Sequence, residues 1–314
     1  MSDPAPPADL TIIIVSWNVL ELLGRCLDSI RESSPHLTIE TIVVDSGSYD
    51  GTVTMVRERY PWVVLLPQPE NVGFPRGNNI GFARANGRYL LALNPDTQLI
   101  GDALSKMLAY LEENPTVGLV GPLLRFPDGS IQHSRRRFPN FLTGVFESTW
   151  LHAPGKVLDD YYMRDVPADR VQDVDWVEGA ALMVRREVLD KVGGMDEDYF
   201  MYSEEMDWCR RIKDAGWRVV YLPTAEVVHH QGKSSEQVVT QKHIMFQRAK
   251  LRYFRKHHGV VQSFSIRCVL LANYGWQIVI EGAKALLGSK RTMRLERMRT
   301  YWKVLRSGLK PAGF

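Results

Sequence analysis

Residues 10–15, Leu10-Thr-Ile-Ile-Ile-Val15, form a short run of apolar and β-branched side chains. This pattern is typical of a strand that is buried on both faces. A helical pattern follows, with Leu23, Leu27 and Ile30 on one face, and another helical pattern covers residues 74–86. Further strand patterns occur at residues 41–44, 63–66 and 89–93. The alternation predicts an α/β domain with a mostly parallel, Rossmann-like sheet flanked by helices.

The 314-residue chain has an uneven distribution of charge. Its net charge is +3, and residues 259–314 hold ten Lys/Arg and two Glu, a balance of +8, so residues 1–258 carry −5 (3 − 8). We expect four regions: a disordered N-terminus at 1–9, two halves of one domain at 10–125 and 126–258, and a basic helical extension at 259–314. Residues 126–175 are irregular, and an insertion of that length is usually functional.

The cysteine usage and the N-terminus favour a cytoplasmic protein. Three cysteines lie far apart, without a metal-binding or redox spacing: Cys26, Cys209 and Cys268. The N-terminus lacks the basic and apolar regions of a signal peptide. The apolar segment 268–287 contains Glu281 and Lys284, which indicates an interfacial or packed helix and not a membrane span.

Polar residues follow two of the expected strands, where ligands bind in sheets of this type. Asp96, in Asn94-Pro-Asp-Thr97, follows one strand and precedes a helical pattern, so it can hold a divalent cation or simply close a turn. Asp45 and Ser46 follow another strand. They can bind the imide N–H of uracil or thymine, or form the hydrogen bonds of a turn.

A glycine-rich segment at residues 71–81 lets the backbone approach a ligand, with Arg76 available for a phosphate. It lacks both the Gly-x-Gly-x-x-Gly spacing and the Walker Gly-Lys-Ser/Thr. Neither a dinucleotide-dependent oxidoreductase nor a P-loop enzyme is supported.

Three acidic residues, Glu204, Glu205 and Asp207, begin a helical pattern after Ser203, a plausible N-cap. Acidic residues in a first turn also stabilise the helix dipole. Glu205 shares a stripe with Trp208, Cys209 and Ile212 that should face inward, whereas Glu204 lies about 100° to one side. A carboxyl at the end of an apolar stripe tends to have a raised pKa, which suits a general base, so Glu205 is the better candidate.

His229 and His230 follow a short apolar strand. Adjacent residues of an extended segment point in opposite directions, so at most one faces a given site. Either can be an ordinary surface histidine, and as a metal ligand an imidazole would pair with Asp96 and favour Mn²⁺ over Mg²⁺.

Seven short motifs occur in a fixed order between residues 10 and 234. They are Ile13-Ile-Val-Ser-Trp-Asn18, Ile42-Val-Val-Asp-Ser-Gly-Ser-Tyr-Asp-Gly51, Glu70-Asn-Val-Gly-Phe74, Leu93-Asn-Pro-Asp-Thr97, Asp175-Trp-Val-Glu-Gly-Ala180, Phe200-Met-Tyr-Ser-Glu-Glu-Met-Asp207 and Val227-Val-His-His-Gln-Gly-Lys-Ser234. In this order the chain resembles the inverting family 2 glycosyltransferases of GT-A fold, particularly the bacterial rhamnosyltransferase-like branch. The resemblance implies that residues 10–125 bind a nucleotide-sugar and residues 126–258 bind the acceptor and supply the catalytic base.

The resemblance also implies roles for individual residues. Asp45 would bind the base, Asn94 the ribose region, and Asp96 with His229 a Mn²⁺ or Mg²⁺ ion. Glu205 would be the catalytic base, with Glu204 as its rival. The residues expected to bind the nucleotide-sugar are Ser16, Asn18, Asp45, Ser46, Asn71, Gly73, Arg76, Asn79, Asn94 and Asp96. Those expected at the acceptor are Trp176, Glu178, Gly179, Arg135 and Arg136.

Two basic segments suggest partners. Arg135 and Arg136, beside Phe138 and Phe141, can hold a lipid-linked diphosphate or form a solvated basic face. Residues 289–310 hold eight basic residues and one Glu among apolar ones, which suits an anionic membrane surface on the inner face of the plasma membrane, or a packed helix or homo-oligomer contact. No nucleic-acid recognition motif accompanies this charge.

The expected activity is therefore inverting transfer of rhamnose or another hexose, from a nucleoside-diphosphate-sugar to a glycan or lipid-linked acceptor in cell-surface polysaccharide synthesis. The alternative is a catalytically silent GT-A module that scaffolds a polysaccharide-assembly complex.

Overall fold

The computed structural model describes residues 8–33, 36–149, 151, 155–230, 239–288 and 290–310, with the side chains of Val239 and Thr240 excepted. The chain divides into two compact units. The first comprises Met1–Phe138, Tyr162–Phe200 and Glu204–Ser234, and the second Pro139–Tyr161, Met201–Ser203 and Ser235–Phe314.

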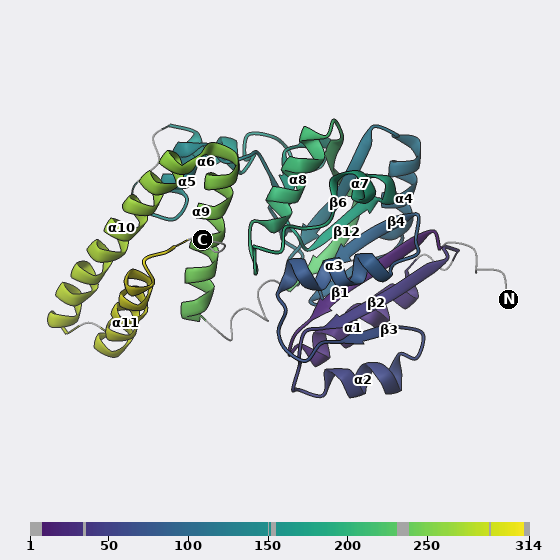
Figure 1. Ribbon diagram of the computed structural model, residues 1–314, viewed down its shortest axis with the longest axis horizontal. Helices are drawn as coiled ribbons and strands as arrows, with labels where there is room; N and C mark the ends of the chain where they lie inside the picture. Colours follow the sequence, from purple (N-terminus) through teal and green to yellow (C-terminus); the bar gives the residue numbers. More distant parts are fainter. Residues whose placement is uncertain are drawn as a thin grey trace. The chain divides into compact units, whose positions relative to one another are not determined.

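The first unit is built on a mixed sheet (Figure 1). Its strand order is β3 (Val64–Pro67), β2 (Ile39–Asp45), β1 (Leu10–Ser16), β4 (Tyr89–Leu93), β11 (Ala181–Arg185), β6 (Val117–Arg125), β12 (Arg218–His229) and β5 (Thr97–Ile100). The first four strands are parallel to one another, and β12 is parallel to β6. Strands β11 and β5 run antiparallel to their neighbours.

Short strands extend this framework. β7 (Ile131–Gln132) pairs with β6, and β9 (Gln172–Val174) pairs with β12. β8 (Arg135–Arg136) and β10 (Trp176–Val177) form a separate two-stranded sheet. Residues 126–175, which were expected to be irregular, thus contribute short strands of two or three residues to both sheets.

Helices cover both faces of the main sheet, as the alternating side chains of β1 require. On one face of the sheet, Ile12 and Ile14 of β1 belong to a buried cluster with Leu23 and Leu27. The helices that contribute to this cluster are α1 (Leu20–Glu32), α2 (Thr52–Arg59) and α4 (Ala103–Glu113). The helices associated with the other face are α3 (Phe74–Arg84), α7 (Arg186–Val192) and α8 (Glu204–Asp214). The predicted α/β sheet with flanking helices is confirmed.

Two glycines of α3 allow this helix to lie close to β1. A Cβ atom added to Gly81 would be 2.3 Å from Ile13 Cγ2, and one added to Gly77 would be 2.7 Å from Val15 Cγ1. The sequence interpretation assigned the glycine-rich segment to close approach of a ligand. For these two glycines the close approach is to the sheet.

Two features of the sheet were not expected. The four residues after Asp96 form β5, and the helical pattern expected beyond Asp96, around residues 102–113, is observed as α4. The strand before His229, expected to be short, is the 12-residue strand β12, which includes His229 and whose pairing with β6 shifts register between Leu222 and Glu226. Both features matter for the site, because β5 and the end of β12 pair with each other.

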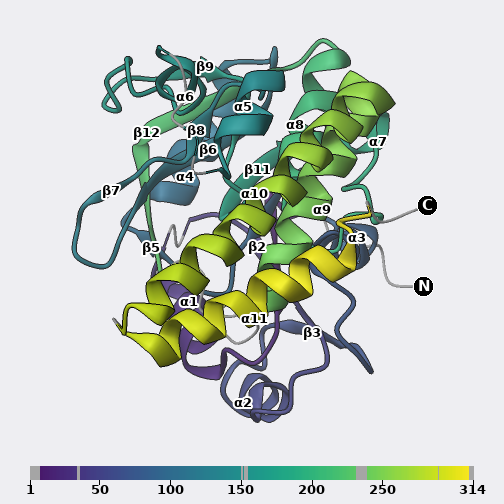
Figure 2. The same ribbon diagram turned by 90° about the vertical axis from the view of Figure 1, so that its left-hand side faces the viewer.

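The second unit is helical, and it contains the expected C-terminal helices. Its helices are α5 (Phe141–Phe146), α6 (Val157–Tyr161), α9 (Val239–His258), α10 (Val260–Leu286) and α11 (Arg291–Ser307). Figure 2 shows α10 and α11 side by side, and α9 contacts both. Lys250 of α9 is 4% exposed, and its Nζ lies 2.6 Å from both Glu147 Oε2 and Ser148 Oγ. Helix α9, which was expected in the α/β domain, is grouped with this unit.

Within the described ranges, none of the helices combines the length and apolar character that crossing a membrane requires.

The contact between α3 and β1 can be tested with Gly81→Ala. The added methyl group overlaps Ile13, so we expect the free energy of unfolding to fall by about 1–3 kcal/mol. The matched control is Gly24→Ala in α1, where a Cβ would make an ordinary 3.5 Å contact with Tyr60 Oη and should be neutral or stabilising by up to about 1 kcal/mol. Denaturant unfolding followed by circular dichroism measures both. Equal stability of the two variants would contradict the close packing.

Candidate active site

The site lies where the parallel strands end. Ser16 and Asp45 are register partners at the ends of β1 and β2, and Ser46 N donates to Ser16 O at 2.8 Å. Asn94 follows β4, and its backbone N–H donates to Ala180 O at 2.9 Å. The carboxyl ends of these strands therefore bring polar side chains from distant segments to one edge, as the sequence predicted.

Asp45 is buried but only half satisfied. It is 1% exposed, and its Oδ2 accepts from Ser48 N at 3.0 Å. Its Oδ1 and the hydroxyl of Ser16 have no hydrogen-bond partner among the described residues. A buried carboxylate oxygen without a donor is costly, and in a functional site it marks a place for one.

The neighbouring loops are ordered by hydrogen bonds among three expected nucleotide-binding residues. Ser46 Oγ accepts from Val72 N at 2.9 Å and donates to Asn71 Oδ1 at 3.2 Å. Gly73 N donates to the same Asn71 oxygen at 3.0 Å. Gly73 has a φ of +80°, and a Cβ there would lie 2.6 Å from Phe200 O, so only glycine fits.

Of three other residues expected to bind the nucleotide, two hydrogen-bond to the protein backbone and one is exposed. Asn18 Oδ1 accepts from Tyr49 N at 2.9 Å, within the loop after β2. Asn79 donates to Met195 O at 2.8 Å and accepts from Met195 N at 2.9 Å, so its amide holds a loop of the protein. Arg76 is exposed.

The pairing of β5 with β12 brings Asp96 and His229 together. Thr97 is the register partner of His229, and His230 N donates to Asp96 O at 2.9 Å. His229 Nε2 lies 3.4 Å from Asp96 Oδ1 and 3.4 Å from Asn94 Nδ2. The side chains of His229 and Asp96 are 8% and 5% exposed. His230 points elsewhere, with Nε2 3.0 Å from Gln98 Oε1.

A residue that the sequence did not reveal completes this side of the site. Gln132, 3% exposed, places Oε1 3.1 Å from His229 Nδ1 and Nε2 3.1 Å from Glu178 Oε2. It belongs to the two-residue strand β7, which has no periodicity to detect. Glu178 also pairs with Arg136, at 2.7 Å.

The burial of the two glutamates at the start of α8 differs from what the apolar stripe predicted. Trp208, Cys209 and Ile212 are fully buried, as expected. Glu204, expected at one side, is only 4% exposed, whereas Glu205 is partly exposed, so the predicted separation of the two glutamates by burial is wrong. Ser203 has a φ of 65°, in the left-handed region and not in the extended conformation usual for an N-cap serine.

Neighbouring groups distinguish these carboxyls from one another. Asp207 is fully buried and pairs with Arg211 at 2.9 Å, a structural contact. Glu205 lies against Gly179, where an added Cβ would be 3.5 Å from Glu205 Cβ. One carboxyl oxygen each of Glu204 and Glu205 is buried without a hydrogen-bond partner in the described part of the chain.

The environment raises the pKa of both glutamates. Burial raises the pKa of Glu205 to about 7, and the charge of Glu178 contributes in the same direction, against backbone hydrogen bonds that lower it. Burial and the charge of Glu205 raise the pKa of Glu204 well above its usual value. A carboxyl that titrates near neutral pH suits a general base.

Three expected acceptor residues lie inside the protein. Arg135 is 2% exposed and donates to the carbonyl oxygens of Met163, Val166 and Pro167. Arg136 is 8% exposed and is held by Glu178, and Trp176 Nε1 donates to Arg137 O at 3.0 Å. These buried side chains bind other groups of the protein, which leaves them no role at an acceptor.

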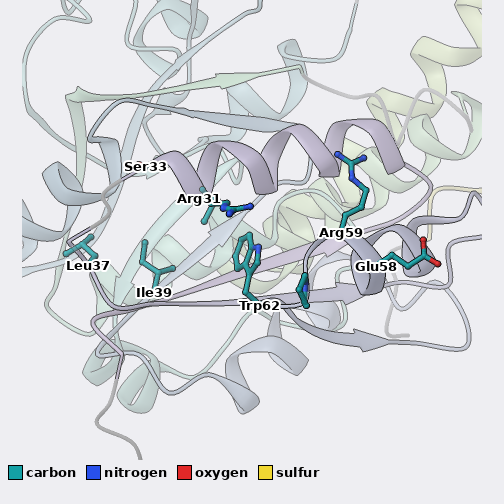
Figure 3. A pocket seen from close by; sticks show the side chains of 9 residues that line it. Arg31, Ser33, Leu37, Ile39, Glu58, Arg59 and Trp62 are labelled. Carbon is teal, nitrogen blue, oxygen red and sulfur yellow. The ribbon is translucent and has the colours of Figure 1, made fainter.

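A hollow of about 570 Å³ lies at the other end of the strands (Figure 3). Ile39, the first residue of β2, lines it together with Arg31 and Trp62. Asp45 is the last residue of the same strand, so this hollow is separate from the site.

Comparisons with known proteins agree on the class of protein. The model of the family described as glycosyl transferase family 2 matches residues 11–193. An N-acetylglucosaminyl-diphospho-decaprenol L-rhamnosyltransferase of Mycobacterium tuberculosis is 32% identical over 241 residues, 72% of this chain and 77% of that protein. The rhamnosyltransferase WbbL of Escherichia coli K12 is 30% identical over 150 residues, 45% of this chain and 52% of that protein.

Solved structures show the same fold. The mannosyltransferase PcManGT of Pyrobaculum calidifontis, in complex with GDP-Man and Mn²⁺, aligns with a TM-score of 0.57 at 22% identity and covers 98% of this chain and 86% of that chain. GalNAc-T7 with UDP, GalNAc and Mn²⁺ aligns with a TM-score of 0.57 at 15% identity and covers 80% of this chain and 48% of that chain.

The raised pKa of Glu205 predicts a pH-dependent cost to stability. Between pH 4.5 and about 7 the folded state keeps a proton that the unfolded state releases, so this carboxyl destabilises the fold as the pH rises. Glu205→Gln removes the cost, so we expect it to raise Tm more at pH 8 than at pH 5, by roughly 2–4 °C for each kcal/mol recovered.

Differential scanning calorimetry in buffer that contains a metal chelator measures the Tm of each variant at the two pH values. Glu113→Gln, at an exposed position in the same unit, is the control and should change Tm equally at both pH values. A Glu205→Gln variant that is destabilised at pH 8 would contradict the raised pKa.

Proposed function

The chain belongs to glycosyltransferase family 2, and from this premise we propose that it transfers a sugar, with inversion, from a nucleoside-diphosphate-sugar to a lipid-linked glycan acceptor in cell-surface polysaccharide synthesis. The observation that carries the proposal is the meeting of Asp96 and His229 at the strand edge that also holds the half-satisfied Asp45.

The donor set fits a divalent cation. Ligand atoms in adjacent octahedral positions of Mg²⁺ or Mn²⁺ lie about 3 Å apart, and Asp96 Oδ1 and His229 Nε2 are 3.4 Å apart. The described residues contain no group of three or more His, Cys, Asp or Glu side chains that could hold a metal. We propose that diphosphate oxygens of the donor and water would supply further ligands. The imidazole favours Mn²⁺ over Mg²⁺.

Each protein group then has a defined task. Asp45 Oδ1 accepts the imide N–H of a uracil or thymine base, and Asn94 contacts the ribose. Glu205 takes a proton from the acceptor hydroxyl as this oxygen attacks the anomeric carbon, and its burial and the charge of Glu178 keep its pKa high. A bound cation supplies the positive charge that stabilises the departing nucleoside diphosphate. A single displacement inverts the anomeric configuration, because no covalent glycosyl-enzyme forms.

The relatives suggest the substrates. Two of them are named as rhamnosyltransferases, and one is named for an acceptor sugar on a decaprenyl diphosphate. We therefore propose dTDP-rhamnose as the donor and a polyprenyl-diphosphate-linked sugar as the acceptor. The catalytically silent alternative predicts that no donor turns over, although Asp96, Glu205 and His229 are all present.

The second unit has a surface suited to such an acceptor's membrane. Helix α10 buries polar groups: Ser263 Oγ donates to Leu251 O at 2.8 Å, and Glu281 pairs with Arg294 at 2.8 Å. Most of its exposed side chains are apolar and recur at helical spacing, with exposures of 79% for Val261, 59% for Phe264, 47% for Trp276, 61% for Val279 and 89% for Leu286.

Helix α11 adds exposed basic residues to this unit, including Arg291, Arg299 and Lys303. An apolar face with basic neighbours suits an anionic bilayer. We propose that the protein binds the membrane peripherally through α10 and α11. Like charges on α11 disfavour a homo-oligomer contact through that helix.

The proposed chemistry predicts separable effects of two substitutions. Glu205→Gln should lower kcat by roughly 10²- to 10⁴-fold with little change in donor affinity, because it removes only the base. Asp96→Ala should abolish the thermal shift that donor and Mn²⁺ produce together. The measurements are sugar transfer and a thermal-shift screen of UDP-, dTDP- and GDP-sugars with Mn²⁺ or Mg²⁺. Metal-dependent transfer by Asp96→Ala, or no shift with any nucleotide, would refute the assignment.

Membrane binding predicts a loss on charge reversal. The triple variant Arg291→Glu, Arg299→Glu, Lys303→Glu should lower partitioning into phosphatidylserine-containing vesicles at least about tenfold in a sedimentation assay. The control carries the same charge change on exposed residues of the first unit, Arg25→Glu, Arg57→Glu and Arg84→Glu. If both triple variants lost the same amount of vesicle partitioning, net charge alone would explain the effect and membrane binding through α11 would be contradicted.

A further inference from the structure

Gln132 connects the Asp96–His229 pair to the Glu178–Arg136 ion pair. All of these residues belong to the first unit, and the side chains of Asp96, His229, Arg136 and Glu178 are 5%, 8%, 10% and 21% exposed. We propose that Gln132, oriented by Glu178, keeps a hydrogen on Nδ1 of His229, so that Nε2, on the side of Asp96, is the nitrogen left to bind a cation. The consequence for metal binding rests on the proposed function. The position of the hydrogen on His229 does not, because it can be measured in the protein without metal or sugar.

The orientation of Gln132 follows from its two neighbours. Its Nε2 lies 3.1 Å from Glu178 Oε2, and a carboxylate only accepts hydrogen bonds. A flipped amide would place two oxygens against each other at this distance. Gln132 Oε1 is therefore the atom that faces His229.

Glu178 is itself held in place. Its Oε1 accepts from Arg136 at 2.7 Å, a charge-assisted hydrogen bond. The Arg136 guanidinium stacks over Tyr162 and Trp176, with its carbon 4.8 and 5.8 Å from the ring centroids. Burial raises the pKa of Glu178, and the positive charge of Arg136 opposes this effect. Arg136 thus has a reason to be buried that does not involve an acceptor.

The consequence for His229 is that one ring position is fixed. Gln132 Oε1, 3.1 Å from Nδ1, needs a donor, so Nδ1 carries a hydrogen. Nε2 is the nitrogen on the side of Asp96 Oδ1 and Asn94 Nδ2, 3.4 Å from each. If the hydrogen were on Nε2 instead, Nε2 would donate to Asp96 Oδ1. This hydrogen bond would occupy both of the atoms proposed to bind the cation. Ordering of a ligand imidazole by a second hydrogen bond is a common device at metal sites.

The adjacent His230 supplies a matched control. It also lies next to a glutamine oxygen, Gln98 Oε1 at 3.0 Å, but through Nε2 and away from Asp96. The test compares Gln132→Met, which keeps the approximate size of the side chain, with Gln98→Met. Glu178→Gln serves as a second variant, because it leaves Gln132 in place and frees its amide to flip.

Two measurements address the proposal. The ¹⁵N spectrum of histidine in the metal-free parent, with His229→Gln to assign the signals, should show the Nδ1–H tautomer at His229. This preference should be lost in Gln132→Met and weakened in Glu178→Gln. Mn²⁺ affinity by electron paramagnetic resonance should fall roughly 10- to 100-fold in Gln132→Met and remain within twofold in Gln98→Met.

An Nε2–H tautomer in the parent would overturn the proposal, as would equal Mn²⁺ affinities of Gln132→Met and Gln98→Met. The tautomer result stands apart from catalysis. An Nδ1–H parent that binds no Mn²⁺ would support the positioning by Gln132 and refute the metal site of the proposed function.

Discussion

The pairing of β5 with the last residues of β12 is the contact on which the site depends. Asp96 precedes β5 and His229 ends β12, so the antiparallel ladder between Thr97 and His229 sets the distance between the two side chains. The register shift within β12 adjusts its pairing with β6 before it reaches this point. Backbone hydrogen bonds therefore position two groups that neither the parallel sheet nor the helices could bring together.

Burial of carboxyl groups is the opposing cost in this site. Glu178 has an arginine to compensate its charge, whereas Glu204 and Glu205 each keep a buried oxygen without a partner in the described structure. Such groups stabilise the protonated form and weaken the fold at neutral pH. In the proposed reaction an acceptor hydroxyl would donate to these carboxyl oxygens. This hydrogen bond would offset the free-energy cost of burying them.

The sequence was informative where local pattern and burial coincide. Apolar runs located the parallel strands, and the polar residues that follow them indicated the edge where ligands bind. The sequence could not show that β5 is a strand, because four residues after a turn carry no periodicity. Gln132 and the burial of Arg136 were invisible for a related reason: both depend on Glu178, more than 40 positions away. The glycines of α3 were noticed, but only the structure shows that two of them face β1.

The distance along the chain between the two halves of the site has a consequence during synthesis. Asn94 and His229, which lie together in the folded protein, are 135 positions apart. At roughly 5–20 residues per second, a ribosome needs on the order of ten seconds to travel between them. During that interval the nascent chain already contains the expected base-binding segment but no imidazole beside Asp96. The polypeptide therefore cannot assemble this pair until β12 has been made.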